Sequence, residues 1–400
     1  QWYLYDRSAR RASFLFSRQQ PLEAFSLVPM EPVVIESRDG LALVSYLTLP
    51  DGADTDADGR PEKPLPMVLD VHGGPTCNYC SHRWRLNYRH QWLANRGYAV
   101  LSVNFRGTVG YGKAFVQAAI GEWGGKMHDD LLDGIDWAIA QGIAIPEKIA
   151  IMGNSYGGYA TLVGMAMTPG RFACGVDVVG PSNLLTELKN SPAYWKPHLK
   201  RWQRQMGGDL DTEEGRKRLL ERSPVTHADK IEGSLLIVHG ANDVRVKQSE
   251  SDQIVEAMLA NEKPVTYLLY PDEGHQIRRT ENRLSLSAVT EVFLANCLGG
   301  RYEPIKDALD GSSIQVPVGA ERIPGLQQAL MRAKGQLQPA GWFRTRPVSN
   351  SCELLMYRDD RYPGSMLRED ITSSGFSRAI PLEYNRYKKL MIEGYCPTLL

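Results

Sequence analysis

The feature that most constrains this chain is a regular alternation of short apolar runs and helical stretches between Pro66 and Cys297. Apolar runs with strand character alternate with stretches of helical periodicity. The predicted strands are 67–71, 98–103, 148–152, 172–179, 235–238 and 265–270, and the predicted helices are 129–140, 155–167, 248–260 and 283–297. This pattern predicts a mostly parallel, doubly wound α/β sheet covered by helices on both faces. Such sheets place function at the carboxyl ends of their strands.

The residues on either side of this alternation divide the chain further. Two hairpins are expected near the start, one pairing 2–6 with 12–17 and one pairing 33–37 with 41–49. Asn183–Asp229 interrupts the alternation and reads as a helical insertion near the mouth of a site. Together the strands suggest a sheet of about eight.

Three regions follow from these observations. Residues 1–32 are a hairpin and linker, residues 33–300 form the α/β domain, and residues 301–400 are a C-terminal extension of unknown role. Residues 301–330 read as loop-like with one short helical stretch, and a second short helix is expected over 383–393.

Charge and hydropathy exclude some classes of protein. The 400 residues hold 46 Lys and Arg against 46 Asp and Glu, which argues against a basic nucleic-acid-binding surface. No apolar run reaches the roughly 18 residues that span a bilayer. Residues 1–20 carry scattered charges and do not read as a secretory signal. The resulting expectation is a cytoplasmic protein.

Two short motifs suggest metal or redox chemistry. Cys77 and Cys80 form a C-x-x-C, and no second pair lies at zinc-site spacing, so we expect two unlinked thiols in a loop. Asp54, Asp56 and Asp58 imitate the start of a calcium loop, but Leu65 stands where a closing Glu is required. A solvated acidic loop is the expectation, with no metal and no cofactor.

Ser155 is the predicted nucleophile. It lies in Gly153-Asn154-Ser155-Tyr156-Gly157, a G-x-S-x-G between a predicted strand and a predicted helix, which is the context that this motif requires. Small neighbours allow the tight turn that lifts the hydroxyl clear of the sheet. The alternative is a glycine-rich packing turn.

A serine hydroxyl needs a base to become nucleophilic. In α/β proteins with a G-x-S-x-G nucleophile, an acidic residue and then a histidine follow the serine along the chain. His275 lies in the loop after the 265–270 strand, and Asp243 is the one carboxylate in the turn after 235–238. Among the alternatives, His239 reads as structural, and Asp272 and Glu273 as residues of the site's rim.

An acyl-transfer site also needs donors for the developing oxyanion. The backbone N–H of Tyr156, directly after the nucleophile, is the first candidate. The second is Gly73 in His72-Gly73-Gly74-Pro75, where missing side chains allow close approach. His72 could instead be a loop histidine that holds this loop by hydrogen bonds.

With these residues assigned, the chain resembles the catalytic domain of the prolyl oligopeptidase family, and especially its acylaminoacyl-peptidase and dipeptidyl-peptidase branches. The matching segments are His72–Pro75, Asn104–Gly112, Gly121–Gly125, Gly153–Tyr159, Asn242–Val246 and Glu273–His275. The resemblance covers about Val33 to Gly300. It implies an α/β-hydrolase fold, a Ser155, Asp243 and His275 triad, and an oxyanion hole from Tyr156 and Gly73. It also implies that Tyr156, Tyr159 and Leu184 line the pocket for the residue before the scissile bond.

The family's N-terminal β-propeller is largely missing from this resemblance, since only Trp2–Ser17 looks like the end of a last blade. Without that gate, we expect an open site that accepts activated or short-chain esters and aryl amides as well as short peptides. The surface that a propeller would cover favours homo-oligomerisation.

Two activities use the same triad, so the residues leave both open. One is a serine peptidase that removes blocked or free N-terminal units from short peptides, and the other is a carboxylesterase built on a peptidase ancestor. A non-catalytic binding protein is a third reading, in which the serine or histidine would usually be lost.

Overall fold

The computed structural model describes residues 2–17, 20–77 and 80–335, and these contain eleven strands and ten α-helices. The strands are β1 (Trp2–Asp6), β2 (Arg11–Phe16), β3 (Glu31–Glu36), β4 (Ala42–Thr48), β5 (Leu65–Val71), β6 (Ala99–Val103), β7 (Ala144–Asn154), β8 (Cys174–Val178), β9 (Ser234–Gly240), β10 (Val265–Tyr270) and β11 (Gln315–Val318). The helices are α1 (Tyr88–Asn95), α2 (Lys113–Gln117), α3 (Lys126–Ala140), α4 (Tyr156–Met167), α5 (Leu184–Lys189), α6 (Leu199–Met206), α7 (Glu213–Glu221), α8 (Gln248–Ala260), α9 (Thr280–Leu298) and α10 (Leu326–Ala333).

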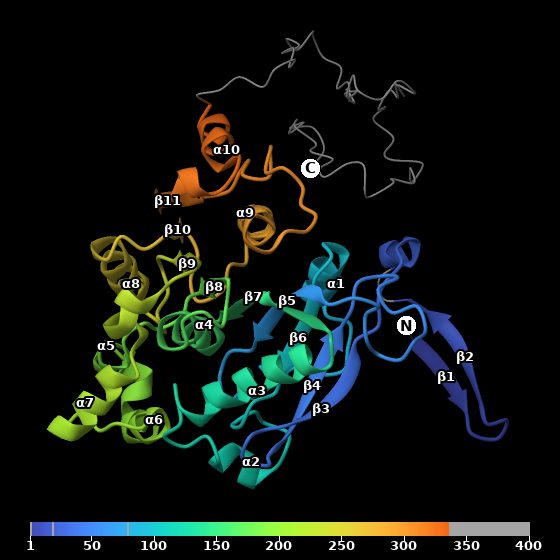
Figure 1. Ribbon diagram of the computed structural model, residues 1–400, viewed down its shortest axis with the longest axis horizontal. Coiled ribbons are helices and arrows are strands. Elements are labelled where there is room, and N and C mark those ends of the chain that lie inside the picture. The colour runs from blue at the N-terminus through green and yellow to red at the C-terminus, as the bar shows by residue number, and fades with distance from the viewer. Residues whose placement is uncertain (1, 18–19, 78–79, 336–400) are drawn as a thin grey trace, which may run out of the picture. The chain divides into compact units, whose positions relative to one another are not determined.

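Within these ranges one nine-stranded sheet forms in the order β11-β10-β9-β8-β7-β5-β6-β4-β3 (Figure 1). The strands from β10 to β6 run parallel to one another, whereas β11, β4 and β3 join antiparallel. The predicted α/β class and mostly parallel sheet are confirmed. The strand count exceeds the prediction of about eight because β11 adds a strand at one edge.

Helices cover both faces of this sheet, as the alternation predicts. Side chains of α3, α4 and α8 pack into one core cluster, and side chains of α1, α9 and α10 pack into a second. Strand β5 shows the two-residue period that separates them. Met67 and Leu69 belong to the first cluster and Val68 to the second. The core therefore lies in two apolar layers, one on each side of the strands.

Residues 301–335 are more ordered than their sequence predicts. In place of a loop with one short helix, they contain β11, a 3-10 turn at Ala320–Arg322 and α10. Ile305, Leu309 and Leu326 are buried in the α9 core cluster. This region was hard to predict because β11 has only four residues and pairs with β10 at an edge. The helix expected over 383–393 lies outside the described residues, and the predicted domain limits stay predictions.

The first two strands pair with each other, and every residue of both is exposed (Figure 1). The predicted helical insertion resolves into α5, α6 and α7, with 3-10 turns at Ala193–His198 and Pro224–Lys230.

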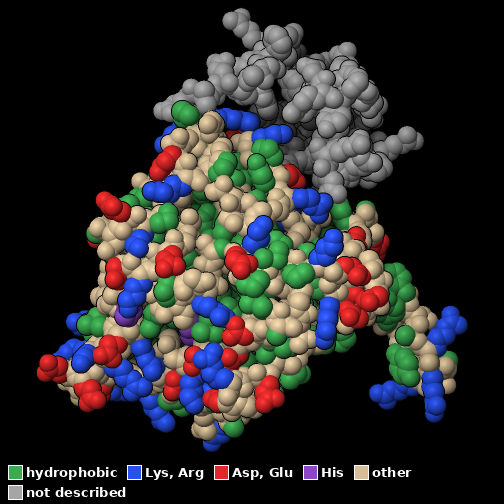
Figure 2. Space-filling view, in the orientation of Figure 1, with side chains coloured by type: hydrophobic (Ala, Val, Ile, Leu, Met, Phe, Trp, Pro, Cys, Tyr) green, Lys and Arg blue, Asp and Glu red, His purple; other side chains and the backbone are tan. Residues whose placement is uncertain are grey.

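Figure 2 shows basic and acidic side chains interspersed over the face that it presents, in line with the balanced totals of the two kinds of charge. None of the described helices is both long and apolar enough to cross a membrane.

The cysteine prediction is wrong. Cys77 and Cys80 are joined in a disulfide instead of being two unlinked thiols, and Cys174 is joined to Cys297. The second link ties β8 to α9 across 123 residues of sequence. Sequence spacing could not reveal it, because only the fold brings these two positions together.

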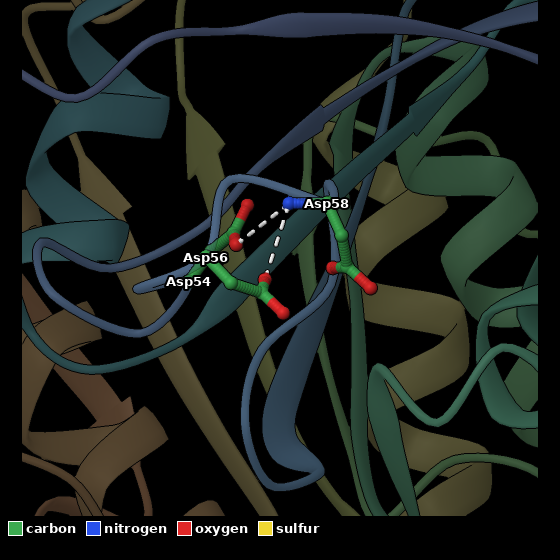
Figure 3. Close-up of side chains that lie close together, drawn as sticks. All are labelled: Asp54, Asp56 and Asp58. Atoms are coloured by element: carbon green, nitrogen blue, oxygen red, sulfur yellow. Dashed lines mark hydrogen bonds between the residues drawn. The ribbon is translucent and has the colours of Figure 1, made fainter.

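The acidic loop closes on itself (Figure 3). The carboxylates of Asp54 and Asp56 both accept a hydrogen bond from the backbone N–H of Asp58. A carboxylate oxygen from each of the three aspartates lies within 4.8 Å of the others. Leu65 begins β5 and directs no oxygen-bearing side chain to the loop. The aspartates' hydrogen bonds are thus those of a tight polar turn.

Candidate active site

Ser155 occupies the sharp turn between β7 and α4. Its backbone has φ 59° and ψ −117°, a conformation that costs roughly 1–3 kcal/mol in a non-glycine residue. Its N–H donates to the carbonyl of Val178 at 2.8 Å, which ties the turn to β8. A side chain at Gly153 would lie 2.6 Å from the carbonyl oxygen of Val71, so the turn needs glycine to approach β5. The sheet therefore fixes where the Ser155 hydroxyl lies.

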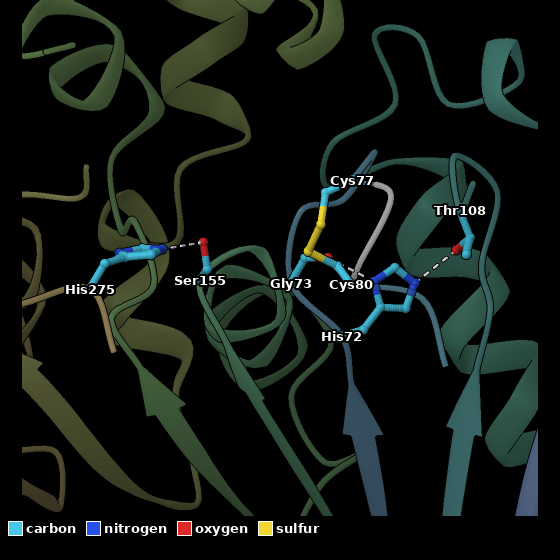
Figure 4. Close-up of a disulfide and its surroundings, with 7 residues drawn as sticks. All are labelled: His72, Gly73, Cys77, Cys80, Thr108, Ser155 and His275. Carbon is cyan, nitrogen blue, oxygen red and sulfur yellow. Dashed lines mark hydrogen bonds between the residues drawn. A yellow bond between two sulfur atoms is a disulfide. The ribbon is translucent and has the colours of Figure 1, made fainter. Parts of the chain in front are cut away.

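Ser155, His275 and Asp243 form one hydrogen-bonded chain. Nε2 of His275 lies 3.0 Å from Oγ of Ser155, and Nδ1 lies 2.6 Å from Oδ2 of Asp243. Figure 4 shows the His275 ring facing the hydroxyl. The three side chains follow the carboxyl ends of β7, β9 and β10, which lie at the same edge of the sheet, with β8 between β7 and β9. This geometry suits proton transfer from the hydroxyl to the imidazole.

Asp243 is buried, and its second oxygen is also occupied. Oδ1 accepts hydrogen bonds from the backbone N–H groups of Arg245 at 2.8 Å and Val246 at 3.1 Å. These bonds fix the carboxylate plane so that Oδ2 faces His275. The acid is therefore oriented by backbone donors of its own turn.

Glu273 was predicted to line the rim, and this is wrong. Only 4% of its surface is exposed, and its carboxylate accepts bonds from the backbone N–H of Arg278 and Arg279 and from the side chain of Asn282. It ties the residues after His275 to the start of α9. Its sequence neighbour Asp272 is exposed and pairs with Arg279.

Two other histidines that follow Ser155 in the sequence, His239 and His227, bond elsewhere. His239 is fully buried, with Nδ1 on Ser251 Oγ at 2.7 Å and Nε2 on the Val246 carbonyl at 3.1 Å. Burial lowers the pKa of its imidazole, which keeps the ring neutral. Its bond to the Val246 carbonyl helps to fix the turn that carries Asp243. His227 bonds to the Glu221 carbonyl in the helical insertion.

Gly73 lies against the nucleophile turn on the other side of Ser155. A Cβ at this position would lie 3.4 Å from Ser155 Cβ and 2.8 Å from the carbonyl oxygen of Asn154. Tyr156, the other proposed donor, is the first residue of α4, where backbone N–H groups have no partner within the helix. The helix dipole also favours negative charge at this end. The two backbone segments thus approach the hydroxyl together.

His72 holds the Gly73 segment in place. Its Nδ1–H donates to the Gly73 carbonyl at 2.7 Å, and Nε2 lies 2.8 Å from the Thr108 hydroxyl (Figure 4). The ring stacks on Phe105 at 4.4 Å. Burial, with a smaller effect of His82, lowers its pKa to about 3, so the ring is neutral at ordinary pH. Thr108 is a positioning residue that sequence reasoning did not single out, although it lies inside a quoted motif.

The three residues expected in the substrate pocket are buried, and Tyr156 is 2% exposed. Tyr159 and Leu184 are 0% exposed, and the Tyr159 hydroxyl donates to the Arg222 carbonyl at 2.9 Å. Tyr159 belongs to an aromatic cluster with Trp123 and Tyr156 behind the nucleophile. Their assignment to the pocket stays a prediction.

Comparison with known proteins places this geometry in a family context. The model of the prolyl oligopeptidase family matches residues 84–301. Dipeptidyl aminopeptidase BIII of Pseudoxanthomonas mexicana is 56% identical over 337 residues, which cover 84% of this chain and 48% of that protein. Dipeptidyl peptidase family member 6 of Caenorhabditis elegans is 41% identical over 349 residues, covering 84% of this chain and 47% of its own length. The chain thus spans about half the length of these curated relatives.

Solved structures agree on the fold. An acylaminoacyl peptidase in complex with a Z-Gly-Gly-Phe-chloromethyl ketone superimposes with a TM-score of 0.64 at 23% identity, covering 75% of this chain and 46% of that one. A puromycin-hydrolysing peptidase of Mycobacterium tuberculosis gives 0.61 at 26% identity, covering 69% and 40%. The α/β-hydrolase architecture expected from the sequence is therefore confirmed.

Proposed function

Because this chain belongs to the prolyl oligopeptidase family, we propose that it is a serine peptidase working through an acyl-enzyme on Ser155. The observation that carries the proposal is the hydrogen-bonded chain from Ser155 Oγ to His275 at 3.0 Å and on to Asp243 at 2.6 Å. Such a chain activates a hydroxyl that is otherwise a weak nucleophile at neutral pH.

The reaction follows from these contacts. His275 takes the proton from Ser155 Oγ as the oxygen attacks the scissile carbonyl, and Asp243 holds the ring and stabilises its positive charge. The oxyanion is stabilised by the N–H groups of Tyr156 and Gly73. His275 then gives its proton to the leaving amine. In the second half of the reaction, His275 activates a water molecule, which attacks the acyl carbonyl and releases the acyl group from Ser155.

We infer that the substrates are peptides with a free N-terminus, from which dipeptides are released. The support is a relative at 56% identity whose name describes a dipeptidyl aminopeptidase. Ester hydrolysis is the second candidate, since it uses the same acyl-enzyme. An ester's alkoxide leaves with less need for timed protonation than an amine does. The homo-oligomerisation expected from the sequence also stays a prediction.

Location also stays a prediction. The cytoplasmic expectation rests on the sequence, whereas two disulfides in the described residues are typical of proteins in oxidising compartments. We therefore favour a location outside the reducing cytosol. Mass spectrometry of alkylated protein from the native source would decide, because free thiols at Cys174 and Cys297 would contradict it.

The test compares kcat/KM on dipeptidyl p-nitroanilides, N-acyl-aminoacyl p-nitroanilides and p-nitrophenyl esters. We expect the dipeptidyl anilides to be cleaved, and Ser155→Ala to lower turnover of every substrate by roughly 10³-fold or more. Ser13→Ala in the exposed strand β2 is the matched control and should keep full activity. Ester turnover without anilide turnover would replace the peptidase proposal with an esterase, and an active Ser155→Ala would remove both.

A further inference from the structure

A disulfide lies in the loop that carries one of the two proposed oxyanion donors. Cys77 and Cys80 are linked a few residues after Gly73, and Figure 4 shows the sulfur bridge beside His72 and Gly73, on the side away from His275. The N–H of Cys80 also donates to the Cys77 carbonyl at 3.4 Å. The covalent bond therefore joins the same two residues that the backbone hydrogen bond alone joins weakly.

The bridge is placed where it acts on the donor segment. A Cβ at Gly74 would lie 3.3 Å from Cys77 Cβ, so the first cysteine packs directly against the residue that follows Gly73. On the opposite flank of Gly73, His72 fixes the Gly73 carbonyl. One neutral, buried contact and one covalent link thus hold the same short segment from its two ends.

The loop's ends stay anchored whatever the state of the disulfide. The Asn104 side chain binds both backbone groups of His82, accepting from its N–H at 3.0 Å and donating to its carbonyl at 3.2 Å. His72 remains held by Thr108. Opening the bridge would therefore free Cys77 and Cys80 from each other without releasing His72 or His82 from these anchors.

The two cysteines are only partly buried, so small thiols reach them, whereas Cys174 of the other disulfide is 0% exposed. A link across three residues also contributes little to the stability of the fold compared with one across 123. The bridge beside the site is consequently the one that can open while the protein remains folded.

We propose that Cys77 and Cys80 form a redox-responsive clamp on the oxyanion side of the site, so that reduction by a dithiol lowers turnover. A thiolate of the dithiol attacks one sulfur and forms a mixed disulfide, which its second thiol resolves. Two electrons and two protons pass to Cys77 and Cys80, and the dithiol becomes a disulfide. The inference rests on the proposed function, because turnover is what it modulates.

The expected size follows from the role of the donor. Loss of one oxyanion donor costs roughly 10²- to 10³-fold in kcat, and a loosened donor loses part of that, about tenfold. KM changes little, because the donor acts on the transition state more than on bound substrate. The nucleophile turn is untouched, so Ser155 still reacts fully with a fluorophosphonate at saturation.

The experiment measures kcat on a dipeptidyl p-nitroanilide, which thiols do not cleave, before and after dithiothreitol, with alkylation and peptide mapping to show which cysteines are reduced. We expect about a tenfold fall when mapping of an alkylated aliquot shows Cys77 and Cys80 to be reduced, with recovery when the protein that was not alkylated is reoxidised. Cys77→Ser/Cys80→Ser should stay at the low level with or without reductant. Cys174→Ala/Cys297→Ala is the matched control and should keep the response.

The outcomes separate this inference from the proposed function. If kcat stays the same while Cys77 and Cys80 are shown to be reduced, the clamp is refuted and the peptidase proposal stands. If the Ser-substituted pair still responds to dithiothreitol, the response has another origin. Absence of Ser155-dependent turnover in the oxidised protein would refute the proposed function itself. The comparison of kcat before and after reduction uses the unaltered chain, so it still tests the inference if the double substitution folds poorly.

Discussion

The two sides of Ser155 are built on different principles. On the acid–base side, Asp243 and His275 follow neighbouring parallel strands, and backbone N–H groups orient the Asp243 carboxylate. On the proposed oxyanion side, a buried histidine holds the Gly73 segment, and the Cys77–Cys80 disulfide lies beside it. Strand ends are fixed by the sheet, whereas the loop depends on contacts that single substitutions or a change of solution conditions can remove. The oxyanion side is therefore where activity can be adjusted without dismantling the fold.

The largest expected effect is on the acid–base side. In Asp243→Asn, the amide can still accept from Arg245 and Val246 through its oxygen, but its NH₂ then faces His275 Nδ1 and favours the wrong tautomer. We expect kcat on an ester substrate to fall by roughly 10⁴-fold with little change in thermal midpoint. Asp272→Asn, an exposed carboxylate near His275, is the control and should stay near the parent rate. Equal losses in the two variants would contradict the assignment of Asp243.

The second prediction compares a glycine-to-alanine substitution on the proposed oxyanion side with one on the acid–base side. Gly73→Ala puts a methyl group 2.8 Å from the Asn154 carbonyl oxygen, so the loop must move away from the nucleophile. Gly274→Ala, directly before His275, meets its nearest atom at an ordinary 3.4 Å. We expect kcat to fall roughly 10²- to 10³-fold in the first and to stay within about threefold in the second. Steady-state kinetics on one ester measures both, and similar values would remove the proposed donor role of Gly73.

The sequence was sufficient for the framework and for choosing Ser155, Asp243 and His275, which the structure joins by hydrogen bonds. A two-residue period in β5 and the strand, turn and helix around Ser155 are local signals, so the sheet and the position of Ser155 could be predicted from them. The catalytic roles of Ser155, Asp243 and His275 stay proposals. The Asp243 and His275 predictions depended on chain order and position after strands, which a parallel sheet converts into spatial proximity.

What sequence reasoning missed depends on contacts between distant residues. Thr108 reaches His72 across 36 residues, and Cys174 reaches Cys297 across 123, and neither pair has a local pattern. The rim prediction for Glu273 rests on its closeness to His275 in sequence, which does not determine whether the side chain is buried. Its burial comes from three donors at the start of α9, which only the folded chain assembles.

The smallest expected effect is a loss of unfolding free energy at acid pH, and it comes from histidines around the loop that carries Gly73. Burial lowers the pKa of three histidines in and around its loop, to about 3 for His72 and about 4 for His82 and His90. Each ring is neutral in the folded chain at pH 5, but near its ordinary pKa of 6.5 it takes a proton in the unfolded chain. Unfolding therefore becomes easier as pH falls below 6.5 towards 4, by up to roughly 1.4 kcal/mol per pH unit for each histidine.

Replacing one of these histidines should flatten that dependence. In His82→Gln, one imidazole no longer gains a proton on unfolding, whereas the backbone groups of residue 82 can keep their bonds to Asn104. Urea unfolding at pH 7 and pH 5 gives the drop in unfolding free energy for the parent and for the variant. We expect a smaller drop in the variant, even if its stability at pH 7 is lower. An unchanged drop would mean that His82 is already protonated in the folded chain, and that acid does not act on the oxyanion side through this residue.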